Sequence, residues 1–412
     1  MSSAESSDER SPVNGAGKRV DGGPRRPYDV VLFGATGFVG ELTAAYLLAH
    51  APQGCRLALA GRNRAKLERL RERLADGSGS APALLTAAAD DPAALRALAE
   101  SAHVVATAVG PYVHHGEALV AACAAAGTDY LDLTGEAEFV DSMYLRHDAR
   151  ARETGARIVH SCGFDSVPYD LGVYYTVRHL PEGVPLRVDG FVRARGAFSG
   201  GTLASSLTVA GRGRQTLAAA RERRRYEPRP ASGRRVRVPL GGPRFSRETG
   251  AWALPLPTID PQVVRRSAAA LERYGPDFRY RHYAAVRTLP VALAAPVGIA
   301  GFVAAAQVPA FRGWVADRYP AGRGPDAERR ARSWFRVRFV GEGGGRRVLT
   351  EVAGGDPGYG ETAVMFAEAA LCLAHDELPA TAGQVTTAVA MGDALTERLT
   401  AAGIRFRVAA AD

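Results

Sequence analysis

The chain has 412 residues, which is enough for two domains of ordinary size. Hydrophobic residues make up 46% of it and charged residues 23%, a composition that excludes wholesale disorder, a collagen-like fibre and a polytopic membrane protein. The net charge is +9, and the only two lysines are Lys18 and Lys66. Neither lies four residues after a tyrosine, so the Tyr-x-x-x-Lys mechanism of short-chain reductases is excluded.

The four cysteines form no C-x-x-C pair and have no zinc-finger spacing with histidine. We therefore expect no disulfide framework and no metal. Residues 1–27 are rich in Ser, Gly, Pro and charge, and we interpret them as a disordered tail without a signal peptide. A cytoplasmic protein is expected, and its oligomeric state is left open.

Short apolar runs alternate with helical patterns between residues 28 and 166. We expect strands at 28–33, 56–60, 83–88, 103–109, 129–132 and 156–161. Helices are expected between them, at 41–50, 64–75, 93–100, 116–126 and 137–153. This alternation predicts an α/β fold whose N-terminal domain, residues 28–166, is a Rossmann domain with a doubly wound parallel sheet.

The pattern changes after residue 166. A helix at 168–179 is followed by strand-like segments without regular helices between them, at 185–195, 234–239, 278–285, 334–341 and 346–353. We expect a second α+β domain with a mixed sheet over 167–375, and a C-terminal segment over 376–412. Helices at 361–375 and 393–402 and a strand at 404–408 complete the chain.

Two segments of the second domain have unusual compositions. Residues 211–247 hold twelve arginines and two glutamates, and no nucleic-acid motif accompanies them. We expect a solvated surface, or one that meets anionic lipid or an acidic partner, and no binding of nucleic acid. Residues 288–311 contain no charge and lie between Arg287 and Arg312.

Three interpretations of 288–311 remain open: a buried core helix, an interfacial element that meets a membrane or a lipid substrate, and a membrane span. Three prolines argue against the span. We expect peripheral association with an anionic membrane, the inner face of the plasma membrane.

A glycine-rich turn follows the first predicted strand. The sequence Gly34-Ala-Thr-Gly-Phe-Val-Gly40 between a strand and a helix is typical of dinucleotide binding, because its glycines let the backbone approach a pyrophosphate. After the second strand, Arg62 stands where an acidic residue would bind the ribose of NAD, which favours NADP(H). The expected cofactor-binding residues are Gly34, Thr36, Gly37, Phe38, Val39, Gly40, Arg62, Asn63, Gly110, Pro111, Cys162 and Gly163.

Chemically useful side chains follow the fourth and sixth strands. Gly110-Pro111-Tyr112 ends one strand, and Ser161-Cys-Gly-Phe-Asp-Ser-Val-Pro168 ends the other. Ser166 also fits an ordinary helix start, and Cys162 a packed small thiol. The candidate proton donors are Tyr112, Ser166 and Tyr169, and the sequence does not choose among them.

Taken together, the motifs resemble those of the saccharopine dehydrogenase-like oxidoreductases. Gly354-Gly-Asp-Pro-Gly-Tyr-Gly360 and Ala390-Met-Gly-Asp-Ala394 are similar to the bacterial branch of trans-acting enoyl reductases. The resemblance implies NADP(H), a C-terminal segment that packs on the first domain, and reduction of a carbon–carbon double bond on a lipid or polyketide-derived acyl chain, as in glycolipid assembly. The alternatives are a membrane-docked nucleotide-binding protein without turnover and a saccharopine-type amino-acid dehydrogenase.

Overall fold

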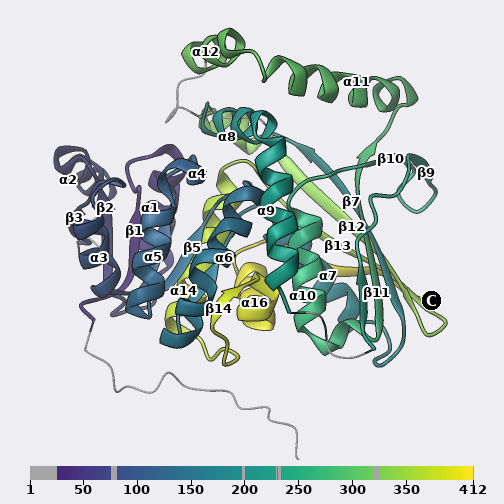
Figure 1. The fold of residues 1–412 in the computed structure, drawn as a ribbon, viewed down its shortest axis with the longest axis horizontal. Coiled ribbons are helices and arrows are strands. Elements are labelled where there is room, and N and C mark those ends of the chain that lie inside the picture. Colours follow the sequence, from purple (N-terminus) through teal and green to yellow (C-terminus); the bar gives the residue numbers. More distant parts are fainter. Residues whose placement is uncertain are drawn as a thin grey trace, which may run out of the picture.

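A computed structural model describes residues 26–75, 81–196, 200–228, 230, 233–318 and 324–411. The predicted tail lies almost entirely outside these residues. The described chain forms two sheets with helices packed between and around them (Figure 1).

The first sheet is parallel and has seven strands in the order β14-β6-β5-β4-β1-β2-β3. Its strands are β1 (Tyr28–Phe33), β2 (Leu57–Gly61), β3 (Ala83–Thr86), β4 (Ala102–Thr107), β5 (Asp129–Asp132), β6 (Arg157–Val159) and β14 (Gly383–Val385). Strand order reverses between β1 and β4, so the loops after these two strands diverge and leave a crevice at the carboxyl edge of the sheet. The predicted Rossmann fold is confirmed.

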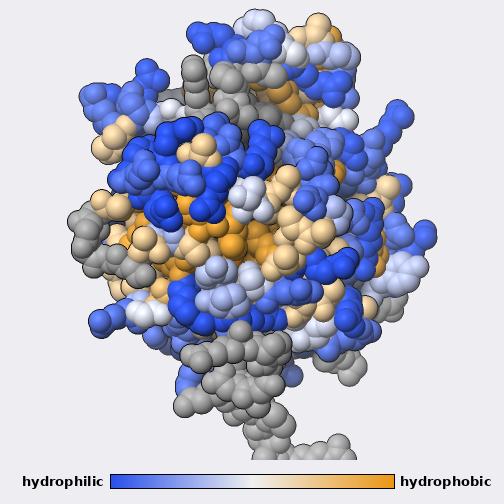
Figure 2. All heavy atoms as spheres, turned by 90° about the vertical axis from the view of Figure 1, so that its left-hand side faces the viewer, coloured by the Kyte–Doolittle hydropathy of each residue, from blue (hydrophilic) through white to orange (hydrophobic). Residues whose placement is uncertain are grey.

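Helices cover both faces of the first sheet. On one face lie α1 (Phe38–His50), α2 (Arg64–Leu74) and α14 (Gly360–His375), and on the other α3 (Pro92–Glu100), α5 (Glu117–Ala126) and α6 (Ala137–Thr154). The short α4 (Tyr112–His115) follows β4. Burial on both faces explains why these strands read as continuous apolar runs rather than as alternating ones. Figure 2 views this end of the molecule and shows hydrophilic side chains gathered at the height of α2.

The second sheet is mixed, as predicted. Its strands run in the order β15-β13-β12-β7-β11-β10-β9, and β8 pairs with β11. Their bounds are β7 (Leu186–Arg195), β8 (Arg235–Arg237), β9 (Arg244–Ser246), β10 (Ala251–Pro255), β11 (Asp277–Val286), β12 (Trp334–Gly343), β13 (Arg346–Gly354) and β15 (Arg405–Ala411). Strand β11 runs parallel to β7 and β8, and the other neighbours are antiparallel.

The expectation that no regular helices lie between these strands is wrong. Besides α7 (Val167–Arg178), the structure has α8 (Gly200–Gly211), α9 (Gly213–Tyr226) and α10 (Asp260–Ala270). Helix α9 packs on α6 of the first domain, and α10 packs on α7 and β11. The many arginines concealed α9, because they occupy its buried face as well as its exposed one. A one-turn helix, η1 (Glu272–Tyr274), and α13 (Ala327–Ala331) complete this part.

The C-terminal elements divide between the two sheets. Strand β14 extends the first sheet beside β6, whereas β15 pairs with β13 of the second. The helices α15 (Thr387–Ala390) and α16 (Gly392–Ala401) lie between them in the chain. The C-terminal residues therefore contribute to both sheets.

The uncharged segment forms α11 (Leu289–Ala305) and the start of α12 (Pro309–Arg318), which stand apart at the top of Figure 1. Of the α11 residues only Ala292 is buried, and Leu293 and Val297 are 68% and 73% exposed. The interpretation as a buried core helix is therefore wrong for the single chain. Among the described residues no single helix has the length and composition of a membrane span, although α11 and the first part of α12 meet that test as a pair bent by 104°.

Candidate functional site

The glycine-rich turn joins β1 to the N-terminus of α1. Gly34 has a φ of 86°, a conformation that favours glycine, and its amide donates to the carbonyl oxygen of Ala60 at 2.9 Å. A side chain on Gly40 would come within 2.2 Å of the Gly34 carbonyl oxygen, so Gly40 lets the helix pack on the turn. A Cβ on Gly37, the N-cap of α1, would meet no atom of another residue closer than 3.4 Å. The turn therefore presents open backbone at a helix N-terminus, which is how pyrophosphate is bound.

The residues between these glycines have different surroundings. Phe38 packs edge-on against Tyr359 at 5.1 Å between ring centroids, which links the turn to the start of α14. Thr36 lies at the mouth of an open cavity of about 580 Å³ whose other lining residues are Glu41, Lys66, Arg69, Glu72 and Arg73. Val39 supplies the carbonyl oxygen to which Thr43 donates within α1.

Positive charge is in slight excess beside this cavity, because its lining holds Lys66, Arg69 and Arg73 against Glu41 and Glu72. Arg62 is exposed and follows β2, and among the described residues no ion pair holds the guanidinium of Arg62 or the ammonium of Lys66. Asn63 has a structural role, because its side chain caps α2 by accepting from the amide of Lys66 at 3.0 Å. Arg62 follows Gly61, whose Cβ would lie 3.9 Å from the Thr36 hydroxyl oxygen, so the Arg62 guanidinium suits a cofactor that carries an additional phosphate.

The loop after β4 is held by a carboxylate. Glu136 accepts from the amides of Tyr112 and Val113 at 3.0 and 2.8 Å, and Gly110 and Pro111 precede them. The Tyr112 hydroxyl donates to Thr107 and accepts from the amide of Leu133. Burial raises the pKa of Tyr112 well above its usual value. Its proton is already committed to the backbone, so Tyr112 positions two loops and is the weakest of the three candidate donors.

A buried aspartate organises the ends of β5 and β6. Asp132 accepts from the Tyr130 hydroxyl at 3.1 Å and from the amide of Ser161 at 2.8 Å, and it lies 2.6 Å from Nδ1 of His160. Ser161 is held at a φ of 62°, which is rare for a residue other than glycine. Strain of this kind persists only where surrounding contacts fix it, and here the hydrogen bond from the Ser161 amide to Asp132 is one such contact.

The following residues meet α14. Cys162 is fully buried, and burial raises the pKa of its thiol well above the usual value, so it fits the packed small thiol. A Cβ on Gly163 would lie 2.8 Å from Leu133 and 2.9 Å from Thr362, which explains a glycine there by packing. The Cys162 thiol is therefore not free to bind a ligand, and Gly163 has no side chain that could.

Asp165 also lies at this edge, and the predicted set of site residues did not include it. Its side chain is exposed to solvent, yet the surrounding protein desolvates it and raises the pKa of the carboxyl group to about 6. Its Oδ2 lies 3.4 Å from where a Cβ on Gly135 would be, which places it between the ends of β5 and β6. A carboxyl group with this pKa exchanges a proton near neutral pH.

The two other candidate donors flank Asp165 in the chain. Ser166 is fully buried, and its hydroxyl has no hydrogen bond within the described residues. Tyr169 is 3% exposed and packs on Phe164 at 5.5 Å. Burial raises the pKa of Tyr169 well above its usual value, and the nearby carboxyl groups of Asp260 and Asp165 raise it further. The Tyr169 hydroxyl therefore stays protonated.

The second domain closes this group with residues that local motifs do not mark. Asp260 is buried at the start of α10 and accepts a hydrogen bond from the Thr258 hydroxyl. Burial raises the pKa of the Asp260 carboxyl group well above the usual range. Burial lowers the pKa of His282 to about 3, so its ring is neutral. Its Nδ1 lies 2.7 Å from the Tyr280 hydroxyl, and its ring packs edge-on against Tyr169 at 4.9 Å.

The comparisons with known proteins agree with this geometry. Residues 30–159 match the saccharopine dehydrogenase NADP-binding domain. The chain is 42% identical to a Mycobacterium tuberculosis protein with the provisional name trans-acting enoyl reductase Rv2449c, over 93% of this chain and 97% of that one. It is 35% identical to the trans-acting enoyl reductase of Mycobacterium bovis, over 92% and 97%. The chain belongs to the saccharopine dehydrogenase-like oxidoreductases, in the branch that holds the trans-acting enoyl reductases.

A solved structure shows the same fold at the level of the whole chain. Saccharopine dehydrogenase (L-Glu forming) from Saccharomyces cerevisiae superposes with a TM-score of 0.53 at 11% identity, over 93% of this chain and 100% of that one. As a member of this family the protein is an NADP-dependent oxidoreductase. The free cations beside Thr36 and the open backbone at Gly37 fit that cofactor.

One further cluster contains potential metal ligands. Atoms of Asp29, Cys55 and His375 lie within 4.8 Å of one another. Asp29 is already ion-paired with Arg56 at 2.5 Å, and burial raises the pKa of the Cys55 thiol to about 11, which disfavours the thiolate that a metal needs. The sequence-based expectation of no metal stays a prediction.

Proposed function

We propose that the protein reduces a carbon–carbon double bond conjugated to a carbonyl group, on a lipid or polyketide-derived acyl chain of the kind used in glycolipid assembly. Two relatives named as trans-acting enoyl reductases support this reaction through their identity over almost the whole chain. The observation that carries the proposal is the exposed Asp165 carboxyl group at the carboxyl edge of the first sheet.

The reaction needs three contributions. Bound NADPH supplies a hydride to the β-carbon. The chain must then stabilise negative charge on the carbonyl oxygen and give one proton to the α-carbon. Tyr169, whose hydroxyl stays protonated, is suited to hold the carbonyl oxygen. Asp165, whose pKa is about 6, is suited to give the proton and to regain one from solvent.

Aromatic side chains around these groups fit an apolar substrate. Phe164 packs edge-on against Phe335 at 5.0 Å and against Tyr169 at 5.5 Å. In this arrangement the aromatic side chains would exclude water from one side of the bound acyl group. Asp165, on the other side, would keep contact with solvent.

The test is oxidation of NADPH by α,β-unsaturated acyl thioesters of increasing chain length. With 4-deuterated NADPH we expect deuterium at the β-carbon, and in deuterated water a second label at the α-carbon. Tight NADPH binding without oxidation by any thioester favours the protein without turnover. Oxidation only with an amino-acid-derived imine favours the amino-acid dehydrogenase.

We also propose that α11 and α12 attach the protein peripherally to an anionic membrane. Exposed apolar side chains along both helices support this, at Leu289, Val291, Leu293, Val297, Ile299, Val303, Val308 and Trp314. The arginines at 287 and 312 add charge that anionic headgroups attract, each with about 1 kcal/mol. Co-sedimentation with anionic and neutral vesicles tests the proposal, and binding that persists in high salt and carbonate contradicts a peripheral mode.

A further inference from the structure

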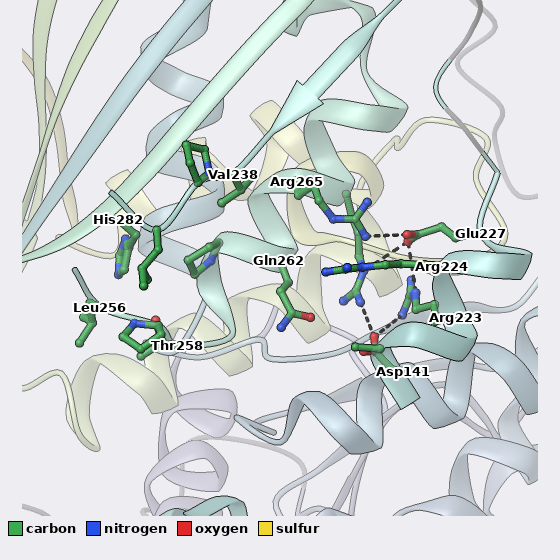
Figure 3. Close-up of a pocket in the computed structure, with 16 residues that line it drawn as sticks. Asp141, Arg223, Arg224, Glu227, Val238, Leu256, Thr258, Gln262, Arg265 and His282 are labelled. Atoms are coloured by element: carbon green, nitrogen blue, oxygen red, sulfur yellow. Dashed lines mark hydrogen bonds and ion pairs between the residues drawn. The ribbon is translucent and has the colours of Figure 1, made fainter. Parts of the chain in front are cut away.

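A cavity of about 260 Å³ lies where α6, α9 and α10 meet the second sheet (Figure 3). One wall carries charge: Asp141 of α6, Arg223 and Arg224 of α9, and Arg265 and Arg266 of α10, with Glu227 after α9. The other lining residues include Leu256, Thr258 and His282. Figure 3 shows the arginines on one side, His282 on the other and Gln262 between them.

The arginines outnumber their partners. Arg223 is 3.3 Å from Asp141 and 3.2 Å from Glu227, and Arg266 pairs with the same two carboxylates. Arg265 lies 2.5 Å from Glu227. Arg224 also lines the cavity, so the lining holds four guanidinium groups and two carboxylates, a surplus of two positive charges.

The surplus lies on the more exposed arginines, because Arg224 is exposed and the Arg265 side chain is 33% exposed, whereas the two arginines that pair with Asp141 are largely buried. The side chains of Arg223 and Arg266 are 4% and 11% exposed, and Nε of Arg266 is buried without a hydrogen bond. Burial is the main cause that lowers the pKa of Arg223 to about 10, and the positive charge of Arg266 is the second. Asp141 and Glu227 compensate the two largely buried guanidinium groups, so Arg224 and Arg265 carry the positive charge that is available to an anion entering the cavity.

The cavity borders the reaction site through His282. His282 forms part of its wall, and the ring of His282 packs on Tyr169. Nε2 of His282 is buried without a hydrogen bond and lies 3.7 Å from Asp260. Apolar residues in the lining, among them Val238, Leu240 and Leu256, suit a hydrocarbon or pantetheine-like chain.

We propose that this cavity is a subsite for an anionic group of the substrate, a phosphate or a carboxylate, carried on the chain whose reactive end reaches Tyr169 and Asp165. The identity of the reactive end rests on the proposed function. The binding of an anion in this cavity does not depend on that function. The NADP site has its own cations beside Thr36 and shares no lining residue with this cavity.

The experiment measures binding without turnover, by calorimetry on protein saturated with NADP⁺. Three ligands are compared: a saturated acyl-coenzyme A thioester, which carries phosphates, the N-acetylcysteamine thioester of the same acyl group, which is uncharged, and saccharopine, which carries carboxylates. Arg224→Ala and Arg265→Ala are the test variants. Arg225→Ala is the matched control, because Arg225 is exposed on the same helix and does not line the cavity.

We expect each test variant to weaken binding of the preferred anionic ligand about tenfold, as loss of a charge-assisted hydrogen bond does, and to leave the uncharged thioester unchanged. Arg225→Ala should change neither. Dependence seen only with the coenzyme A thioester identifies the anion as phosphate, and dependence seen only with saccharopine identifies it as carboxylate.

The proposal is overturned if the test variants weaken charged and uncharged ligands equally, or if no anionic ligand depends on Arg224 and Arg265. If enoyl thioesters are not reduced but binding still depends on these arginines, the proposed reaction fails and the subsite stands.

Discussion

The two walls of the reaction site are built in different ways. The wall from the first sheet consists mainly of loop backbone and glycine, brought together where parallel strands end, with Asp165 at its edge. The wall from the second domain consists of buried side chains from elements that are apart in the sequence, such as Asp260 of α10 and His282 of β11. One wall offers hydrogen-bond donors to an invariable cofactor, and the other offers side chains that can vary with the substrate.

This difference separates the effects of mutation. Changes in the glycine-rich turn or at Arg62 should alter cofactor binding, whichever substrate is used. Changes at Asp165 or in the second wall should alter turnover or substrate binding and leave the cofactor bound. Single substitutions in each part of the site test that separation.

Asp165→Asn should lower kcat about 10²- to 10⁴-fold, the usual contribution of a positioned proton donor, with unchanged NADPH affinity. In the wild type, kcat should fall as pH rises through about 6, because only the protonated carboxyl group can donate. The variant should lack this decline. Steady-state kinetics over pH 5–9 measure both effects.

Two controls accompany that variant. Because the pKa of Asp165 is higher in the folded protein than in the unfolded chain, folding binds a proton, and stability falls as pH rises between the two values. Asp165→Asn should therefore be no less stable than wild type at pH 7. Tyr169→Phe should keep the decline near pH 6, and a profile that loses it would make Tyr169 the donor instead.

Gly37→Val should abolish NADPH binding while the protein stays folded. The new side chain has room beside the turn but occupies the space that a pyrophosphate needs. Gly40→Ala is the contrast, because its Cβ would meet the Gly34 carbonyl oxygen and should lower stability even without cofactor. Thermal unfolding with and without NADPH distinguishes the two. Stabilisation of Gly37→Val by NADPH would show that the turn does not hold the cofactor.

Arg62→Ala should weaken NADPH binding tenfold to a hundredfold, since a charge-assisted contact to phosphate contributes about 1.5–3 kcal/mol. Affinity for NADH, which lacks the 2′-phosphate, should not change. Fluorescence titration with both cofactors measures the ratio. Equal affinities of wild type and variant for NADPH would transfer the role to Lys66 or Arg69.

The sequence predicted the first wall well because local rules determine it. A glycine between a strand and a helix, or a polar side chain after a strand, fixes the backbone within a few residues, and the parallel sheet then places the loops side by side. Asp165 lies within such a motif, but its raised pKa comes from protein that surrounds it in space. The cavity beside the second wall could not be predicted, because its arginines resembled a solvated surface and only the packing of α9 on α6 shows that Arg223 is buried.

Helix α11 differs from both walls, since its apolar side chains face solvent in the single chain. Leu293 and Val297 are four residues apart and lie on one side of the helix. If they enter a membrane interface, Leu293→Ser should weaken binding to anionic vesicles about fivefold, because about 1 kcal/mol of apolar burial is lost. Leu217→Ser is the matched control, since Leu217 is 59% exposed on α9. Neither change should affect folding or NADPH binding, because neither side chain is buried in the chain. If both variants and the wild type bind vesicles equally, α11 does not bind the membrane and is instead a surface for another copy of the chain or a protein partner. Analytical ultracentrifugation would then detect an association that Leu293→Ser disrupts.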